Sequence, residues 1–397
     1  MAATSTRADR APWFPFIAGC FAFFTVMAGA TVPTPLYPIY ADTYGFSPII
    51  ITAIFAMYSA GVIGALLLTG PWSDQIGRKP LLLGGLALAF ASGICFVAAQ
   101  GLPLLLAARF LQGASVGIFT SAATLAVKEM APESHPRIGA IGSTVANMGG
   151  LGMGSVIGGA VAAVAPDPLI FPYLFHLGMV VLATGLLWRA PEPIQTAENP
   201  KLRPQGLAVP SEVRGFFVPA AISAFAGFMI CGFMGSITPS YLGQVLGFQG
   251  DHVAIGTVAG LIFLMSCFGQ IAEDRLPEKM VLPIGMGVLT LGIAGITVGL
   301  AMVSLWALCA GIVVAGLGHG VAFKGGLSAI GRNSPEGQAS AVTASYFTVA
   351  YVAISIPVLV VGALRMVIDL TPVSVMYAAA STILAALAFV LIRRRQQ

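Results

Sequence analysis

The sequence predicts an all-α polytopic membrane protein, with twelve transmembrane helices arranged as two six-helix bundles that are parallel repeats of one another. Three observations lead to this prediction. Of the 397 residues, 57% are hydrophobic and only 9% are charged, whereas a soluble domain carries roughly 25% charged residues. Twelve apolar stretches reach the ~20 residues that a helix needs to cross a bilayer. One long polar stretch, residues 190–213, divides them six and six.

The predicted spans are long, continuous apolar runs. Transmembrane barrel strands would be ~10 residues long and would alternate in polarity, so helices are the better prediction. The spans are expected at residues 13–36, 48–69, 80–99, 102–126, 138–164, 169–188, 215–237, 252–272, 280–299, 303–325, 339–362 and 371–392.

The basic residues predict the orientation of these spans. Of the 19 Lys and Arg residues, all but Arg109 and Arg365 fall near the two termini or near every second connection between spans. Cytoplasmic loops of membrane proteins carry an excess of Lys and Arg. We therefore expect a multi-pass protein of the cell (inner) membrane, with both termini in the cytoplasm.

Similar short segments recur in the two halves at a nearly constant separation. The predicted domains are residues 1–189, a cytoplasmic linker 190–213, and residues 214–397. Because six is an even number of spans, both copies have the same orientation, which defines a parallel repeat. The matching segments are Thr34-Pro35-Leu36-Tyr37 with Thr238-Pro239-Ser240-Tyr241, Gly45-Phe46 with Gly247-Phe248, Gly70 with Gly269, and Pro132-Glu133 with Pro335-Glu336.

A polar island, GPWSDQIGRKP, separates the second and third spans. Asp74 and Arg78 are four residues apart and can pair if the loop is helical, and an acid near a helix N-terminus is favoured by the helix dipole. The island resembles the loop signature of the major facilitator superfamily at Gly70, Asp74, Gly77, Arg78 and Lys79. The resemblance extends over the whole chain and implies the fold of bacterial drug and sugar-efflux antiporters, with these five residues as a conformational latch. The alternative is that the two basic residues only anchor the loop on the cytoplasmic side.

The second-half copy of the island, GQIAEDRLPEK, keeps Gly269 and an acid at Glu273. It lacks the Gly-Arg-Lys order, so its role as a latch is left open.

Arg109 lies roughly 10 Å into the fourth span at 1.5 Å per residue, where a charge is costly and points to function. The segment Arg109-Phe-Leu-Gln112-Gly resembles the Arg-x-x-Gln-Gly motif of the family, which implies a role in proton transfer or substrate orientation. The alternative is a structural Arg109 that donates to backbone carbonyls between helices.

Glycines recur in the fifth span at Gly150, Gly154, Gly158 and Gly159. They resemble the antiporter signature of drug-efflux members, although Ser155 stands where that signature has proline. Small residues at this spacing also suit generic close packing of helices.

Tyr37 and Tyr241 occupy equivalent helix ends in the two halves, next to Pro35 and Pro239, which should break those helices locally. They are candidates for lining a substrate cavity, together with Asn147; the alternative for the tyrosines is the aromatic belt at the membrane interface. Further candidates are Tyr40, Ser236, Thr238, Tyr346 and Tyr351.

No Asp or Glu falls deep in a predicted span; Asp42 and Asp251 lie near span ends. The lack of a deep carboxylate favours neutral or anionic substrates, though Asp42 could reach the mouth of the cavity. His319 and His176 are ionisable groups inside spans, and His titrates in the range useful for carrying a proton.

The sequence thus predicts a secondary transporter that exports small amphipathic molecules or metabolites by alternating access, driven by the proton gradient. The first alternative is a proton-coupled importer or exchanger of an organic anion; the second is a membrane receptor or scaffold that does not transport. We expect no enzymatic activity, no cofactor, no metal and no nucleic-acid partner. The expected partners are a small-molecule substrate and the lipid bilayer, and the expected state is a monomer.

Overall fold

The computed structural model describes residues 13–200, 202–204, 206–335 and 338–396. Within this part the regular elements are helices, and twelve of them are long and apolar enough to cross a membrane. Both the predicted fold class and the predicted number of spans are confirmed. Arg7, Arg10, Lys201 and Glu336, which entered the orientation and repeat arguments, lie outside the described residues.

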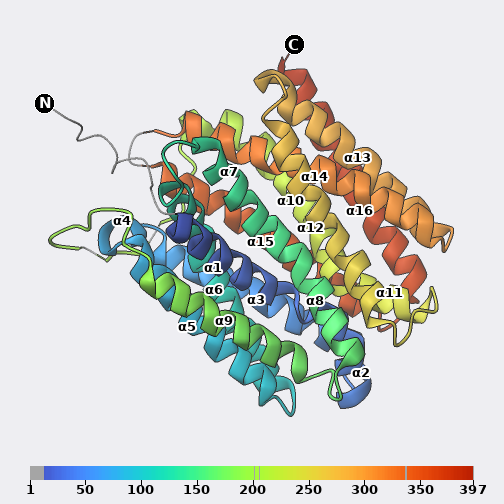
Figure 1. The fold of residues 1–397 in the computed structure, drawn as a ribbon. Coiled ribbons are helices and arrows are strands. Elements are labelled where there is room, and N and C mark those ends of the chain that lie inside the picture. Colours follow the sequence, from blue (N-terminus) through green and yellow to red (C-terminus); the bar gives the residue numbers. More distant parts are fainter. Residues whose placement is uncertain (1–12, 201, 205, 336–337, 397) are drawn as a thin grey trace, which may run out of the picture.

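Figure 1 shows the first six spans, coloured blue to green, beside the last six, coloured yellow to red. Across the junction between the two groups, α3 packs against α15 and α8 packs against α12. The spans of the first group are α1 (Trp13–Thr31) continued by α2 (Tyr37–Tyr44), α3 (Pro48–Thr69), α5 (Arg78–Val97), α6 (Leu102–Glu129), α7 (Pro136–Thr144) continued by α8 (Gly150–Val164), and α9 (Phe171–Arg189). Those of the second group are α10 (Arg214–Ser236) continued by α11 (Thr238–Gln244), α12 (His252–Glu273), α13 (Glu278–Ala301), α14 (Leu305–Asn333), α15 (Ala339–Leu364) and α16 (Leu370–Gln396).

The first span of each half is broken near its end, as the prolines predict. A short 3₁₀ turn, Thr34–Leu36, separates α1 from α2, and Ile237 separates α10 from α11. Proline lacks the N–H that an α-helix needs in its interior. The second helix of each pair is therefore a separate short element at the end of the bundle.

The fifth span contains a π-helical turn, Val145–Gly149, between α7 and α8. Such turns are rare and occur often at functional sites. Some boundaries also differ from those predicted. The tenth span was expected to end at residue 325, whereas α14 continues to Asn333. Its last turns carry one charged side chain, Arg332, which pairs with Glu278 of α13.

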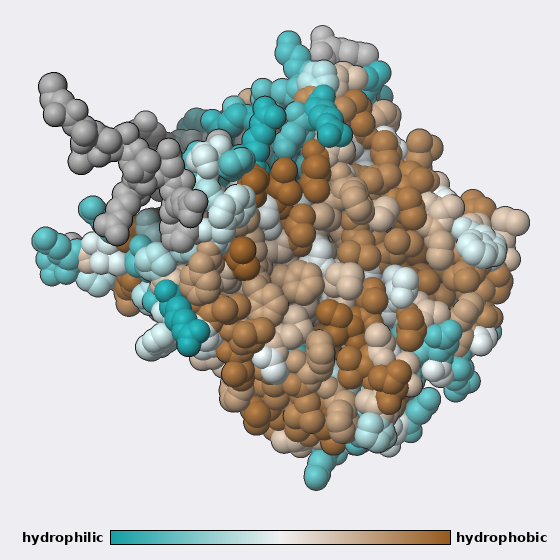
Figure 2. All heavy atoms as spheres, viewed as in Figure 1, coloured by the Kyte–Doolittle hydropathy of each residue, from teal (hydrophilic) through white to brown (hydrophobic). Residues whose placement is uncertain are grey.

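Apolar side chains form a broad surface across the middle of the molecule, and hydrophilic ones gather toward its ends (Figure 2). This is the surface expected of a protein immersed in lipid. We call the end that holds the loop around α4 (Ser73–Ile76) the basic end, and the end that holds α2 and α11 the opposite end (Figure 1).

The polar stretch after α9 crosses the basic end and is held by hydrogen bonds. Trp72 Nε1 donates to the carbonyl of Arg203 at 3.1 Å, and the backbone N–H of Ala208 donates to Ser345 Oγ at 3.1 Å. The stretch therefore contacts both halves of the molecule.

Candidate functional site

The polar island of the first half forms a cluster of charges at the basic end. Arg78, the first residue of α5, donates to Asp74 at 2.5 Å and to both carboxylate oxygens of Glu129 at 3.0 Å. Its guanidinium is buried, whereas the side chain of Asp74 is 70% exposed and that of Glu129 is 31% exposed. We call Asp74, Arg78, Glu129 and Glu192 the Arg78 cluster. It ties α4, α5 and α6 together within the first bundle.

Glu192, in the stretch after α9, caps the start of α5. Its carboxylate accepts hydrogen bonds from the backbone N–H groups of Arg78 at 2.8 Å and Lys79 at 3.0 Å. An anion is favoured at this position because the first N–H groups of a helix have no partner within the helix. The Lys79 ammonium donates to the carbonyl of Ala190 at 2.8 Å, which fixes the end of α9 beside the same loop.

The geometry explains why a glycine precedes Arg78 in the signature. Gly77 has a φ of 101°, a conformation that side chains with a β-carbon rarely adopt. A β-carbon on Gly77 would also lie 2.7 Å from the Glu192 carboxylate. The glycine therefore permits both the sharp turn and the capping contact.

Asp74 also faces the other bundle. Together with Gly70 it lines a pocket of about 280 Å³ whose other wall includes Ala339 and Ser340, at the start of α15. The N-terminus of a helix attracts a negative charge. Asp74 is thus positioned where a small approach of the two bundles would bring it onto the end of α15.

The second half contains a corresponding charge cluster with reversed polarity. Glu278, the first acid of α13, pairs with Arg332 of α14 at 2.8 Å, where the first half has a base on the third span and an acid on the fourth. Lys324 pairs with Glu273 at 3.2 Å and with Asp274 at 2.5 Å. The copy that lacks the Gly-Arg-Lys order therefore still links its helices by charge at the basic end.

Arg109 is fully buried in the first bundle and is surrounded by acceptors. It donates to the carbonyls of Ala30 at 3.0 Å, Ile54 at 3.4 Å and Phe55 at 3.4 Å, and to the side-chain oxygen of Gln112. Gln112 in turn donates to the carbonyl of Gly29. These contacts join α1, α3 and α6. This is the setting described by the structural alternative, in which Arg109 donates to backbone carbonyls between helices.

An aromatic bridge connects this arginine to the second bundle. The Arg109 guanidinium lies 4.8 Å from the ring centre of Tyr58, and the Tyr58 ring meets that of Tyr351, on α15, edge to face at 6.1 Å. Tyr351 is 6.2 Å from Phe228, which packs on His319 at 5.2 Å. The contact between Tyr58 and Tyr351 joins the two bundles, and Phe228 and His319 extend the bridge into the second bundle.

His319, at the end of this bridge, has one ring nitrogen without a hydrogen-bond partner among the described residues. Its Nδ1 lies 2.9 Å from Ser266 Oγ, whereas its buried Nε2 has no hydrogen-bond partner among the described residues. His176, by contrast, is fixed by a contact of 2.9 Å between its Nε2 and the carbonyl of Thr25. Of the two predicted histidines, His319 is the one that touches the aromatic bridge.

The remaining predicted residues lie in different places. Tyr37 is buried and packs edge to face on Phe55 at 6.3 Å. The Tyr241 hydroxyl donates to the carbonyl of Leu300 at 2.7 Å, so it holds α11 to α13. Asn147 is half-buried in the π-helical turn, and Asp42 is exposed at the opposite end. The structure does not bring these four residues into one cavity with Arg109.

The predicted glycines of α8 have two faces. Gly150, Gly154 and Gly158 pack on α1 within the first bundle, where a β-carbon would overlap with the backbone of that helix. Gly159 and the unpredicted Gly152 pack instead on α12 of the second bundle.

Two glycines of α12 complete this second contact. A β-carbon on Gly256 would overlap with the carbonyl of Ser155, and one on Gly260 would overlap with that of Gly152. We call Gly152, Gly159, Gly256 and Gly260 the glycine seam. It lies in the half of the fifth span, Arg137–Val164, and in the half of α12 that are nearest the opposite end.

A second close contact seals the same end. A β-carbon on Gly362 of α15 would overlap with the side chain of Thr52 of α3. The bundles thus touch backbone to backbone near the opposite end, while the pocket beside Asp74 separates them at the basic end.

Sequence reasoning missed Glu129, Glu192, Tyr58 and the α12 glycines. Glu129 follows Lys128 at the end of a span, where it reads as one of several interfacial charges. Spacing within a helix cannot show which partner helix a glycine or an aromatic ring will meet. Among the described residues, no group of three His, Cys, Asp or Glu side chains is placed to hold a metal ion.

Comparison with known proteins places this architecture in a family. The model of the Major Facilitator Superfamily matches residues 19–358. Multidrug resistance protein MdtL of Salmonella typhi is 28% identical over 286 residues, which cover 68% of this chain and 69% of that protein. MdtL of Salmonella typhimurium matches to the same extent.

Two solved structures share the fold at 14% sequence identity. A bacterial homologue of the human lysosomal transporter Spinster, in an inward-facing and unoccupied conformation, superposes with a TM-score of 0.72 over 98% of both chains. A POT family transporter in complex with a thioalcohol-conjugated peptide gives 0.74 over 97% of this chain and 96% of its own. With the family model matched over most of its length, this integral membrane protein belongs to the Major Facilitator Superfamily of transporters.

Proposed function

We propose that the protein exports small amphipathic molecules across the cell (inner) membrane by alternating access, driven by the proton gradient. The observation that carries this proposal is the asymmetry of the junction between the bundles. Toward the opposite end the glycine seam and the Thr52–Gly362 contact join the bundles, and a pocket lies on the outer side of these contacts; at the basic end a pocket lined by Asp74 lies between the bundles.

The positive-inside rule assigns the basic end to the cytoplasm and thereby both termini as well. In this orientation the structure corresponds to a carrier closed toward the outside. Export then requires the seam to part and the basic end to close.

Within the Arg78 cluster, Asp74 has a different role in this cycle from Arg78 and Glu129. Arg78 and Glu129 hold the first bundle rigid, because both lie within it. Asp74 faces the start of α15, and its contact with that helix N-terminus would stabilise the state closed toward the cytoplasm. Breaking this contact would then open the basic end again.

Proton coupling is assigned to His319. In the described part of the chain, the Asp and Glu residues lie in loops or near helix ends, so a buried carboxylate is not at hand in the centre. His319 has one unpartnered ring nitrogen and touches the aromatic bridge between the bundles. A charge gained there would disfavour the dry, tightly packed arrangement of the bridge.

The exported molecules are expected to be neutral or anionic. The name of MdtL, a multidrug resistance protein, supports export of more than one compound. Arg109 is not proposed as the anion-binding residue, because its guanidinium nitrogens already donate to three backbone carbonyls and to the Gln112 side chain.

Flux into proteoliposomes tests the proposal. Purified protein is reconstituted, a pH gradient is imposed, and the uptake of neutral, anionic and cationic amphipathic probes is followed. We expect uptake of neutral or anionic probes that stops when a protonophore removes the gradient. Selective transport of permanent cations would contradict the substrate assignment, and His319→Gln protein that still responds to the gradient would contradict the proton site.

A further inference from the structure

A second pocket lies at the opposite end, between the two bundles. Its volume is about 310 Å³, at the lower limit of small-molecule sites. Thr52 and Gly362, whose contact closes the bundles, form part of its lining. The pocket therefore lies on the outer side of that contact.

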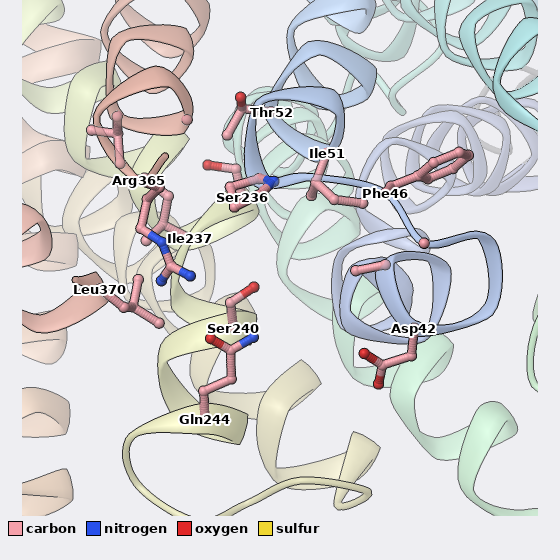
Figure 3. Close-up of a pocket in the computed structure, with 15 residues that line it drawn as sticks. Asp42, Phe46, Ile51, Thr52, Ser236, Ile237, Ser240, Gln244, Arg365 and Leu370 are labelled. Carbon is pink, nitrogen blue, oxygen red and sulfur yellow. The ribbon is translucent and has the colours of Figure 1, made fainter. Parts of the chain in front are cut away.

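The walls of this pocket carry opposite charges. Asp42 of α2 projects from the first bundle, and Arg365, just after α15, projects from the second (Figure 3). Neither side chain forms an ion pair within 4 Å among the described residues. Ser240 and Gln244 of α11 lie between them along one wall (Figure 3).

Arg365 is incompletely satisfied in this position. Its Nη1 is buried and has no hydrogen-bond acceptor among the described residues. Burial lowers the pKa of the Arg365 guanidinium and nearby Asp369 opposes this, but arginine stays charged in proteins. A buried donor without an acceptor is costly and points to a missing ligand or water.

Apolar side chains form much of the remaining wall between the charges. Phe46 and Ile51 line the pocket from the first bundle, and Ile237 and Leu370 from the second. A ligand that matches this pocket has a negative group for Arg365, a positive group for Asp42 and a short hydrocarbon body between them.

We propose that this pocket is a binding site for small dipolar solutes of the amino-carboxylate type. Their carboxylate pairs with Arg365, their ammonium group pairs with Asp42, and their methylene chain packs on Ile51 and Leu370. Because the two charges belong to different bundles, such a ligand bridges the bundles at the end that is already closed. The site lies where the proposed export route would leave the protein, but binding to it can be measured without transport, so the inference does not depend on the proposed function.

Equilibrium binding to the purified full-length protein tests this inference without any gradient, so its result is independent of the transport assay. The probes are 5-aminopentanoate, pentanoate, which lacks the ammonium group, and pentylamine, which lacks the carboxylate. We expect 5-aminopentanoate to bind at least tenfold more tightly than either singly charged probe. Equal affinity for the three probes, or no binding of 5-aminopentanoate, would overturn the proposal.

Two substitutions separate the two charges. Arg365→Gln should abolish the advantage of 5-aminopentanoate over pentylamine, and Asp42→Asn should abolish its advantage over pentanoate. The matched controls Arg275→Gln and Glu133→Gln change exposed charges at the basic end and should leave all three affinities unchanged.

A third variant keeps the test decisive if a charge substitution prevents folding. Ser240→Phe places a large side chain in the pocket without removing either charge. It should weaken binding of 5-aminopentanoate at least tenfold. Wild-type affinity in this variant would show that the solute binds elsewhere and would refute the assignment.

Discussion

Within the Arg78 cluster, the two acids that pair with the Arg78 guanidinium, Asp74 and Glu129, should have different roles. Glu129 accepts two hydrogen bonds from a guanidinium that is only 6% exposed, whereas Asp74 is 70% exposed. A hydrogen bond to a charged group contributes about 1.5–3 kcal/mol, and an exposed ion pair contributes about 0.2–1 kcal/mol. Glu129→Gln, which keeps the shape but loses the charge, should therefore cost about 1.5–3 kcal/mol of stability, and Asp74→Asn no more than about 1 kcal/mol.

Asp74 should matter more for transport than for stability. This carboxylate faces the start of α15 across the pocket at the basic end, so Asp74→Asn should slow transport well beyond its small effect on stability. Unfolding of the purified protein in mixed micelles, followed by tryptophan fluorescence, measures the first quantity; flux into proteoliposomes measures the second.

A double-mutant cycle sharpens this test. Arg78→Gln combined with Glu129→Gln should cost less than the sum of the two single changes, because both remove one interaction. Glu133→Gln, an exposed acid at the same end, serves as the control. The reasoning fails if Asp74→Asn destabilises the protein as much as Glu129→Gln, or if it leaves transport at the wild-type rate.

The other predictions concern the seam, the central arginine and the second charge cluster. Gly159→Val should prevent the bundles from closing at the opposite end, because even a β-carbon overlaps with α12 there; unchanged solvent accessibility of cysteines placed on that side would contradict this. Arg109→Lys should destabilise the protein by about 2 kcal/mol or more, since the planar fork that joins three helices is lost, and wild-type stability would refute its structural role. Glu278→Arg alone should reduce transport, and the double variant Glu278→Arg/Arg332→Glu, which exchanges the two charges, should restore it. Failure of the rescue would show that their ion pair is not needed.

The sequence predicted the spans well because each one needs a long apolar run, which is visible without any tertiary information. The breaks before Tyr37 and Tyr241 were also predictable, since proline at positions 35 and 239 prevents a regular helix from continuing. The end of α14 was not, because Arg332 lies beyond the apolar run and reads as a loop charge until its partner Glu278 on α13 is known.

The site was predicted less completely than the fold. The residues Asp74, Arg78 and Lys79 were found because they are concentrated in one short loop. Glu129 and Glu192 complete that cluster from distant positions, and nothing in their local sequence marks them. The same limit applies to Arg109, whose charge suggested chemistry but whose four acceptors, on three helices, give it a structural setting.

The central claim is that an imposed proton gradient drives export through this carrier. The most direct test is uptake of a neutral amphipathic probe by proteoliposomes, selected for the orientation in which the basic end faces outward. The account predicts accumulation of the probe when the lumen is made acidic, its loss on addition of a protonophore, and no accumulation with His319→Gln. Accumulation that is the same with and without the gradient would contradict the account.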